Sequence, residues 1–132
     1  PEVIYETKKL LEETKEADIT TPITKIKDEG KKAKTNVVKA VVSFTGKALY
    51  FTRLPAPFSS PDLYEHIGLY AYKREALIKF VSFPQSPLEK CESLEQLRAL
   101  ENNLTIYTKI VDFEPISVDV EEDLKIANKY FS

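Results

Sequence analysis

The sequence has very few of the residues that form disulfides and metal centres. It contains one cysteine, one histidine, three glycines, no methionine and no tryptophan in 132 residues. The lone Cys91 excludes an internal disulfide and fits a reducing compartment, so we expect a cytoplasmic protein. One histidine cannot form a multi-histidine metal site, and the three widely spaced glycines form no phosphate-binding loop. Nothing in the spacing places the histidine beside a catalytic nucleophile.

A strong excess of one charge and a long apolar run are also missing. The formal net charge is −2, which argues against general nucleic-acid binding because such binding usually needs a basic face. No apolar run approaches the roughly 20 residues of a membrane helix. The segment from Pro1 to Lys9 is polar, unlike a signal peptide, and it enters a helical pattern at once. We therefore expect neither a nucleic-acid partner nor a membrane partner, and we expect a missing segment upstream of Pro1.

The remaining composition is that of an ordinary globular domain. Hydrophobic residues make up 42% and charged residues 30%, which is enough to bury one core. Helical patterns predict helices over residues 2–16, 75–83, 87–101 and 120–130. Strand patterns occur at residues 18–26, 37–42, 48–52, 66–72 and 104–111. Residues 27–34 and the proline-rich segment 54–61 are expected to be loops. Strands mixed with helices predict one α/β domain with a partly antiparallel sheet.

Two local signals predict where the chain turns and where a helix begins. Thr45-Gly46 between two strand patterns predicts a hairpin. Ser86, Pro87 and Glu89 have the spacing of an N-cap, a first helical residue and a capping-box carboxylate, so they predict a helix start.

Several side chains occupy positions where a ligand site would form, although each also has a purely structural interpretation. Arg53 ends a strand, where α/β folds often have ligand crevices, but a surface ion pair is the more common role of such an arginine. The other positions are a histidine at the start of an apolar strand, two tyrosines on one strand face, a Glu-Gln pair within a helix and an Asp before the last helix: His66, Tyr70, Tyr72, Glu95, Gln96 and Asp119. From the residues alone, core packing, solvent exposure and helix capping explain such positions more often than a ligand site does.

Five segments, in order and over nearly the whole chain, carry a resemblance to a known family. They are NVVK at 36–39, GKALYFTR at 46–53, HIGLYAY at 66–72, SPLEKCESLEQLRALE at 86–101 and VDVEEDL at 118–124. Together they resemble the 3-deoxy-manno-octulosonate (KDO) cytidylyltransferases, or CMP-KDO synthetases. The resemblance implies a three-layer, nucleotide-diphospho-sugar transferase-like fold. Residues 1–132 would be its C-terminal, sugar-binding and dimerisation half, without the N-terminal CTP-binding half.

The resemblance also implies an activity and a site. These enzymes join CTP and KDO with Mg²⁺ to give CMP-KDO and pyrophosphate for lipopolysaccharide biosynthesis, and they form homodimers. Carried over by motif, the KDO site would be lined by Arg53, His66, Tyr70, Glu95 and Gln96, and Asp119 would hold Mg²⁺. Arg53 and Asp119 would be the catalytic residues. Arginine suits a sugar carboxylate and Asp suits a hard cation.

The sequence departs from the family pattern near the metal ligand. Ser117 replaces a usual Gly and Val120 a usual Thr, so the loop around Asp119 is less certain to match. Cys91, Asn103 and Ser43 also differ from the usual residues, and we interpret them as structural variation. Without the CTP-binding half, we expect this chain alone to be inactive.

Two alternatives remain open. The first is a cytidylyltransferase for a related sugar acid, such as a KDO variant or a sialic acid. The second is a non-catalytic dimerisation or sugar-binding module, in which aromatic side chains would form the contact between subunits: Phe51, Phe58, Tyr70 and Tyr72.

Overall fold

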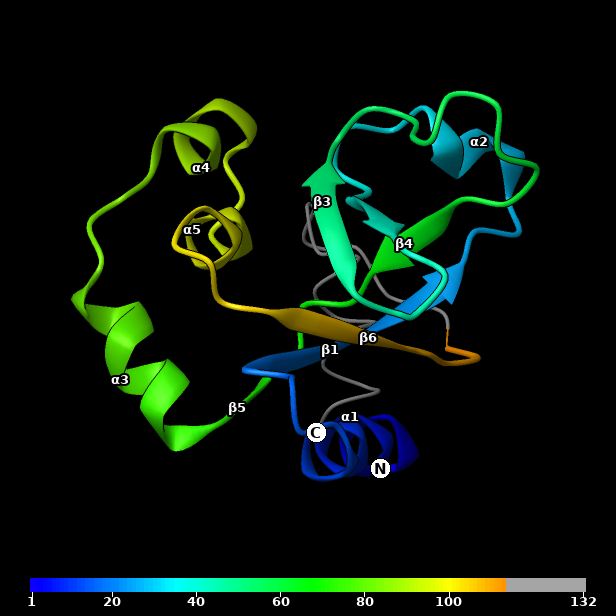
Figure 1. Ribbon diagram of the computed structural model, residues 1–132. Coiled ribbons are helices and arrows are strands. Elements are labelled where there is room, and N and C mark those ends of the chain that lie inside the picture. Colours follow the sequence, from blue (N-terminus) through cyan, green and yellow to red (C-terminus); the bar gives the residue numbers. More distant parts are fainter. Residues whose placement is uncertain (114–132) are drawn as a thin grey trace, which may run out of the picture.

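Figure 1 shows a computed structural model of the chain, in which residues 1–113 are described. The elements in chain order are α1 (Glu2–Glu13), β1 (Ile19–Lys25), α2 (Glu29–Lys32), β2 (Lys39–Val42), β3 (Ala48–Thr52), β4 (Tyr64–His66), β5 (Ala71–Tyr72), α3 (Arg74–Ser82), α4 (Pro87–Glu92), α5 (Gln96–Glu101) and β6 (Ile106–Ile110). The predicted helix at 120–130 and the predicted metal ligand Asp119 lie outside the described residues.

The strands form one mixed sheet, as the sequence predicted. Its order is β3-β2-β4-β1-β5, and β6 pairs with β1. The β1–β6 pair is parallel, whereas β1 pairs antiparallel with both β4 and β5. The predicted hairpin at Thr45-Gly46 is confirmed, because β2 and β3 pair antiparallel across it and Gly46 adopts φ +92°. This positive φ is a conformation that glycine tolerates without strain.

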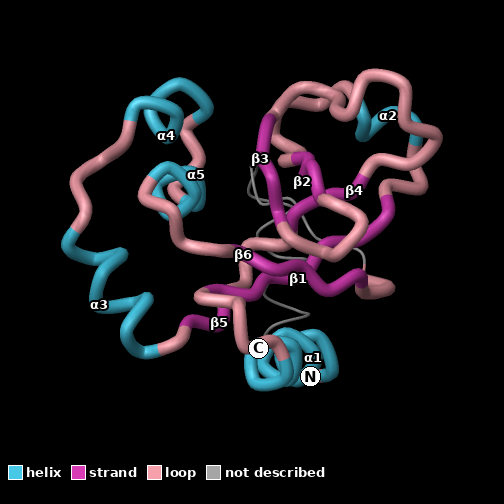
Figure 2. The backbone as a smooth tube through the Cα atoms, viewed as in Figure 1, coloured by secondary structure: helices cyan, strands magenta, loops and turns pink. Residues whose placement is uncertain are grey.

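Strand β1 lies between two layers of the fold. Its first six residues are all buried, so both faces of the strand are covered. Thr20 donates to the carbonyl of Thr7 in α1, which places α1 on one face. Ile19 and Ile23, on the other face, share a core with Leu97 of α5. Figure 2 shows α1 and the α4–α5 pair well apart, with β1 and β6 between them.

Burial in the core excludes Phe51, one of the four aromatic residues predicted to contact a second subunit. The side chain of Phe51 is 0% exposed and packs within the same core, so it cannot contact a second subunit. That part of the prediction was wrong. Phe58, in the proline-rich loop, is fully exposed.

Among the described residues, no helix is long and apolar enough to cross a membrane.

The sequence pattern failed where side chains interrupt regular backbone bonding. The predicted strand 66–72 is two short strands, β4 and β5, separated by residues 67–70, which belong to neither strand. There the hydroxyl of Thr21 lies 2.7 Å from the carbonyl of Leu69 and 3.2 Å from that of Ile67.

The predicted helix 87–101 is likewise broken into α4 and α5. Ser93 adopts a left-handed conformation between them, with φ 57° and ψ 46°. Its carbonyl, at the end of α4, accepts a hydrogen bond from Arg53 instead of continuing the helix.

Two smaller differences concern boundaries. Within the predicted loop 27–34, Asp28 caps the single-turn helix α2 by accepting a 2.9 Å hydrogen bond from Gly30 N. Helix α1 ends at Glu13, a few residues before the predicted end. The start of α4 agrees with the prediction, with Pro87 first in the helix and the Glu89 carboxylate 2.9 Å from Ser86 N.

Candidate functional site

A cavity of about 130 Å³ lies between the sheet and helices α3 and α5. Aliphatic and aromatic side chains form most of its wall, and the polar groups come from two tyrosines and the start of α5; the lining residues are Ile19, Tyr70, Tyr72, Phe80, Glu95, Gln96, Ala99 and Ile106. Such a wall, apolar with a few polar groups, is typical of small-molecule sites. Three of the predicted site residues, Tyr70, Glu95 and Gln96, therefore share one cavity.

His66 joins this group from the neighbouring strand. The centroid of its ring lies 5.4 Å from that of Tyr70, with the two rings tilted, and 4.9 Å from that of Phe51 in an edge-to-face contact. Its Nδ1 lies 3.4 Å from the amide nitrogen of Gln96. The structure thus brings together four of the predicted residues, which come from β4, the β4–β5 connection and the α4–α5 junction.

Protonation in this group is set mainly by burial. Burial lowers the pKa of His66 to about 4, so the imidazole is neutral at pH 7. Burial also raises the pKa of Tyr70, with smaller contributions from Tyr72 and Glu95. Burial also raises the pKa of Tyr72. The cavity therefore presents tyrosine hydroxyls that stay protonated, together with carboxylate and amide groups.

Arg53 is not among the residues that line this cavity. Its guanidinium donates three hydrogen bonds to backbone carbonyls, at 2.7 Å to Glu92, 3.0 Å to Ser93 and 3.0 Å to Thr35. Three of the five guanidinium donors are thereby used: two hold the α4–α5 junction, and the third binds Thr35, ahead of β2. Arg53 has a structural role that the sequence did not indicate, and Glu95 follows that junction directly.

Glu92 supports the site structurally, through contacts that the sequence analysis missed. Its carboxylate accepts from Tyr50 Oη at 2.9 Å, from Thr52 Oγ1 at 3.2 Å and from Arg53 N at 3.4 Å. Burial, followed by this carboxylate, raises the pKa of Tyr50 to about 12. Glu92 and Arg53 together attach the end of α4 to the end of β3. Nothing in the sequence connects these segments, which lie some 40 residues apart.

A buried ion pair fixes the two helices of the site relative to each other. Arg98 of α5 donates to both carboxylate oxygens of Glu89 in α4, at 2.9 and 2.5 Å. The Arg98 guanidinium also lies 5.1 Å from the ring centroid of Phe80, which lines the cavity. The hydrogen bonds from Arg98 lower the pKa of Glu89, so the carboxylate stays charged.

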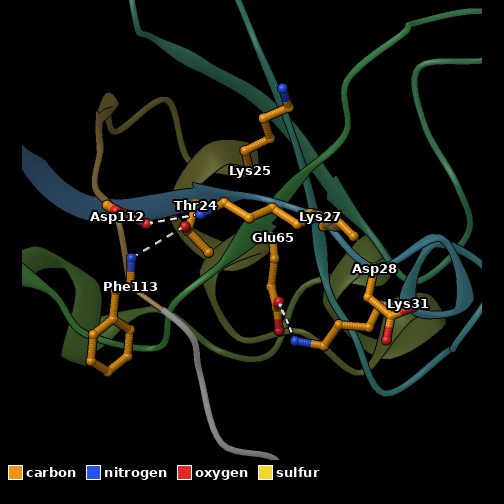
Figure 3. Close-up of a pocket in the computed structure, with 9 residues that line it drawn as sticks. Thr24, Lys25, Lys27, Asp28, Lys31, Glu65, Asp112 and Phe113 are labelled. Atoms are coloured by element: carbon orange, nitrogen blue, oxygen red, sulfur yellow. Dashed lines mark hydrogen bonds and ion pairs between the residues drawn. The ribbon is translucent and has the colours of Figure 1, made fainter.

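A second cavity, of about 150 Å³, opens at the carboxyl end of β1. Figure 3 shows that charged side chains surround it, but its cations already have acidic partners. Lys31 lies 3.2 Å from Glu65, Lys27 3.1 Å from Asp112, and Lys25 3.2 Å from Asp62. None of the predicted site residues lines this cavity, and its paired charges leave no evident unsatisfied group for a ligand.

Metal binding has no support in the described part of the chain. Residues 1–113 contain no group of three or more His, Cys, Asp or Glu side chains arranged to hold a metal ion. The predicted ligand Asp119 is not among them.

The comparisons with known proteins agree with one another. The model of a family described as "Cytidylyltransferase" matches residues 1–110. The chain is 51% identical over 115 residues to the 3-deoxy-manno-octulosonate cytidylyltransferase of Rickettsia prowazekii (strain Madrid E), covering 87% of this chain and 46% of the relative. It is also 51% identical over 115 residues to the enzyme of that name from Parvibaculum lavamentivorans, covering 84% and 45%.

A solved structure supports the same grouping. CMP:2-keto-3-deoxy-manno-octonic acid synthetase complexed with CTP aligns with a TM-score of 0.86 and 28% identity, over 97% of this chain and 54% of that chain. The chain therefore spans about half the length of the relatives that it matches.

Proposed function

Because the chain belongs to the cytidylyltransferase family, we propose that it is the sugar-binding half of an enzyme that transfers CMP from CTP to KDO. The products are CMP-KDO and pyrophosphate, and the pathway supplied is lipopolysaccharide biosynthesis. The observation that carries the proposal is the convergence of His66, Tyr70, Glu95 and Gln96 around one cavity. Sequence similarity alone would not require these side chains to meet.

The chemistry of the cavity suits a polyhydroxylated sugar acid. The Glu95 carboxylate accepts hydrogen bonds from sugar hydroxyls, and the protonated hydroxyls of Tyr70 and Tyr72 can donate. The apolar wall formed by Phe80 and Ile106 covers the carbon skeleton. Hydrogen-bonding groups in such a site reject analogues that lack the matching hydroxyl, which gives stereochemical selectivity.

In this proposal Arg53, which binds the carbonyl of Ser93 two residues before Glu95, supplies the positive charge for the sugar carboxylate. Its three bonds to backbone carbonyls hold the guanidinium in place and leave two donors for the sugar carboxylate. A cation held in advance loses little conformational entropy when the anion binds.

The reaction itself needs groups that lie outside the described residues. A sugar hydroxyl gives up its proton to solvent and its oxygen attacks the α-phosphorus of CTP. An O–P bond forms, the bond between the α-phosphorus and the bridging oxygen breaks, and pyrophosphate leaves. Asp119 would hold Mg²⁺, which supplies charge neutralisation for the phosphates when it is bound. In this proposal the rest of the protein binds CTP, this chain alone is inactive, and the enzyme is cytoplasmic.

Self-association is a further part of the proposal. Phe58, in the proline-rich loop, is fully exposed, as an apolar contact residue of a homodimer would be in the separated chain. Sedimentation equilibrium of the full-length protein and of Phe58→Ser tests this. We expect the wild type to be a dimer and the variant to dissociate at higher concentration, and a monomeric wild type would reject the dimer.

Steady-state kinetics of the full-length protein test the function. With CTP, KDO and Mg²⁺, Glu95→Gln removes the charged acceptor from the cavity, and we expect KM for KDO to rise about tenfold or more. The matched control is Glu75→Gln, on the exposed side of α3, which should leave KM unchanged. Equal behaviour of the two variants would contradict the proposed site. Competition between KDO and sialic acid distinguishes the related sugar acids.

A further inference from the structure

The imidazole of His66 lies between two polar side chains from different elements. On one side, its Nε2 is 2.8 Å from the hydroxyl of Thr21, in the adjacent strand β1. On the other side, its Nδ1 faces the amide nitrogen of Gln96 at 3.4 Å. Thr21 is 0% exposed and Gln96 is 7% exposed, so water does not readily replace either partner. The three side chains form one path from the middle of the sheet to the cavity.

The contacts of Thr21 determine which nitrogen of His66 carries the proton. Its hydroxyl lies 2.7 Å from the carbonyl of Leu69 and 3.2 Å from the carbonyl of Ile67. A carbonyl oxygen only accepts, so the single hydroxyl proton of Thr21 is donated to this pair. The oxygen of Thr21 then accepts from His66, which requires the proton of the neutral imidazole to be on Nε2.

The same assignment of donors and acceptors determines the orientation of the Gln96 amide. With the proton on Nε2, Nδ1 of His66 is an acceptor, so the atom of Gln96 that faces it must be the NH₂ group. The carbonyl oxygen of that amide points away from His66. Because Gln96 lines the cavity next to Glu95, this oxygen is the group that the amide offers to a ligand.

We propose that Thr21 is a positioning residue that acts through His66 to turn the Gln96 carbonyl oxygen toward the cavity, beside the Glu95 carboxylate. This end of the site then holds two neighbouring acceptors. It selects ligands that present hydroxyl donors at adjacent positions, and it disfavours analogues in which one of these hydroxyls is replaced by hydrogen or a carbonyl. That the ligand is a sugar acid rests on the proposed function, whereas the orientation of His66 and Gln96 rests on the contacts together with a neutral imidazole.

The variants that test the path are Thr21→Val and Thr21→Ser in the full-length protein. Valine keeps the shape but cannot donate or accept, whereas serine keeps the hydroxyl. The matched control is Thr20→Val, the next residue of β1, whose hydroxyl faces α1 and donates to Thr7 O. Thr20 is also 0% exposed, so loss of packing and of a buried hydrogen bond is similar in both variants.

The first readout is the tautomer of His66, from ¹⁵N chemical shifts of the imidazole at pH 7. The signals are assigned by their absence in His66→Gln. We expect Nε2 to carry the proton in the wild type, in Thr21→Ser and in Thr20→Val, and we expect Thr21→Val to lose this preference. A proton on Nδ1 in the wild type would overturn the inference, as would an unchanged tautomer in Thr21→Val.

The second readout is the kinetic effect on the sugar. We expect Thr21→Val to raise KM for KDO about tenfold while kcat and KM for CTP change less than about twofold, because one ligand hydrogen bond is lost. Thr21→Ser should restore KM. If Thr20→Val raises KM as much as Thr21→Val does, the role of Thr21 is structural and the inference fails. If the wild type does not use KDO, the proposed function fails and the tautomer still decides the path.

Discussion

Replacing Arg98 by methionine should destabilise the protein by leaving a charged carboxylate without its main partner. The side chains of Glu89 and Arg98 are 6% and 17% exposed, and both oxygens of Glu89 accept from the guanidinium. Breaking a buried pair of this kind costs 3–5 kcal/mol, in general, because one charge remains unpaired. Glu89 keeps its bond from Ser86 N and Arg98 is partly open to solvent, so we take the lower end, about 3 kcal/mol at pH 7.

The loss should depend on pH in a defined direction. In the wild type Arg98 lowers the pKa of Glu89, so this carboxylate stabilises the fold above its ordinary pKa, and the stabilisation is lost as the pH falls below that value. In Arg98→Met the buried carboxyl loses this influence and its pKa rises, so it becomes neutral at higher pH. The difference in stability between wild type and variant should therefore shrink on acidification.

Urea unfolding of the full-length protein, followed by circular dichroism between pH 7 and pH 4, measures this difference. The double variant Glu89→Gln/Arg98→Met should recover at least half of the loss, because no unpaired charge remains. The control is Lys27→Met, which breaks an exposed pair and should cost less than about 0.5 kcal/mol. A loss in Arg98→Met that equals this control, or that does not change with pH, would refute the reasoning.

Three further predictions concern the core and the site. Burial shifts the pKa of His66 from 6.5 to about 4, so the neutral imidazole stabilises the fold fully above pH 6.5 and this stabilisation is lost as the pH falls toward 4. Urea unfolding should show that the wild type loses up to about 3 kcal/mol more of its free energy of unfolding than His66→Gln over this range. Equal losses in the two proteins would contradict the shift. Leu97→Ala removes a side chain that is 0% exposed and should cost about 3 kcal/mol, measured by urea unfolding, whereas a cost below about 1 kcal/mol would mean that this core is not packed as described. Lys39→Met leaves the carbonyls of Lys34 and Arg53 without the 2.6 and 2.9 Å hydrogen bonds from Nζ, so we expect the free energy of unfolding to fall by about 2 kcal/mol. An unchanged midpoint of thermal unfolding would disprove that these bonds stabilise the fold.

Sequence patterns predicted most elements because their signals are local. The β2–β3 hairpin follows from Thr45-Gly46 between two apolar runs, and the start of α4 follows from the Ser86-Pro87 signal. The breaks at residues 67–70 and at Ser93 were not predicted. They involve hydrogen bonds from Thr21 and Arg53, which are distant in the sequence. The periodicity of apolar residues does not indicate such long-range contacts.

The site was predicted from family motifs more fully than from residue chemistry. From the bare sequence, His66 and Tyr70 were better explained as structural residues, and only the resemblance selected them for the site. Their convergence on the cavity with Glu95 and Gln96 agrees with that selection. The roles of Thr21 and Glu92 could not be predicted, because each depends on which strand or helix end lies beside it.

The central claim is that this chain carries the sugar side of a CMP-transferring site. It is tested most directly by ³¹P NMR of the purified full-length protein with CTP, KDO and Mg²⁺. We predict that the CTP signals are replaced by those of pyrophosphate and of a phosphodiester, CMP-KDO, and that omission of KDO prevents both. A folded full-length protein that leaves CTP unchanged in the presence of KDO would contradict the account.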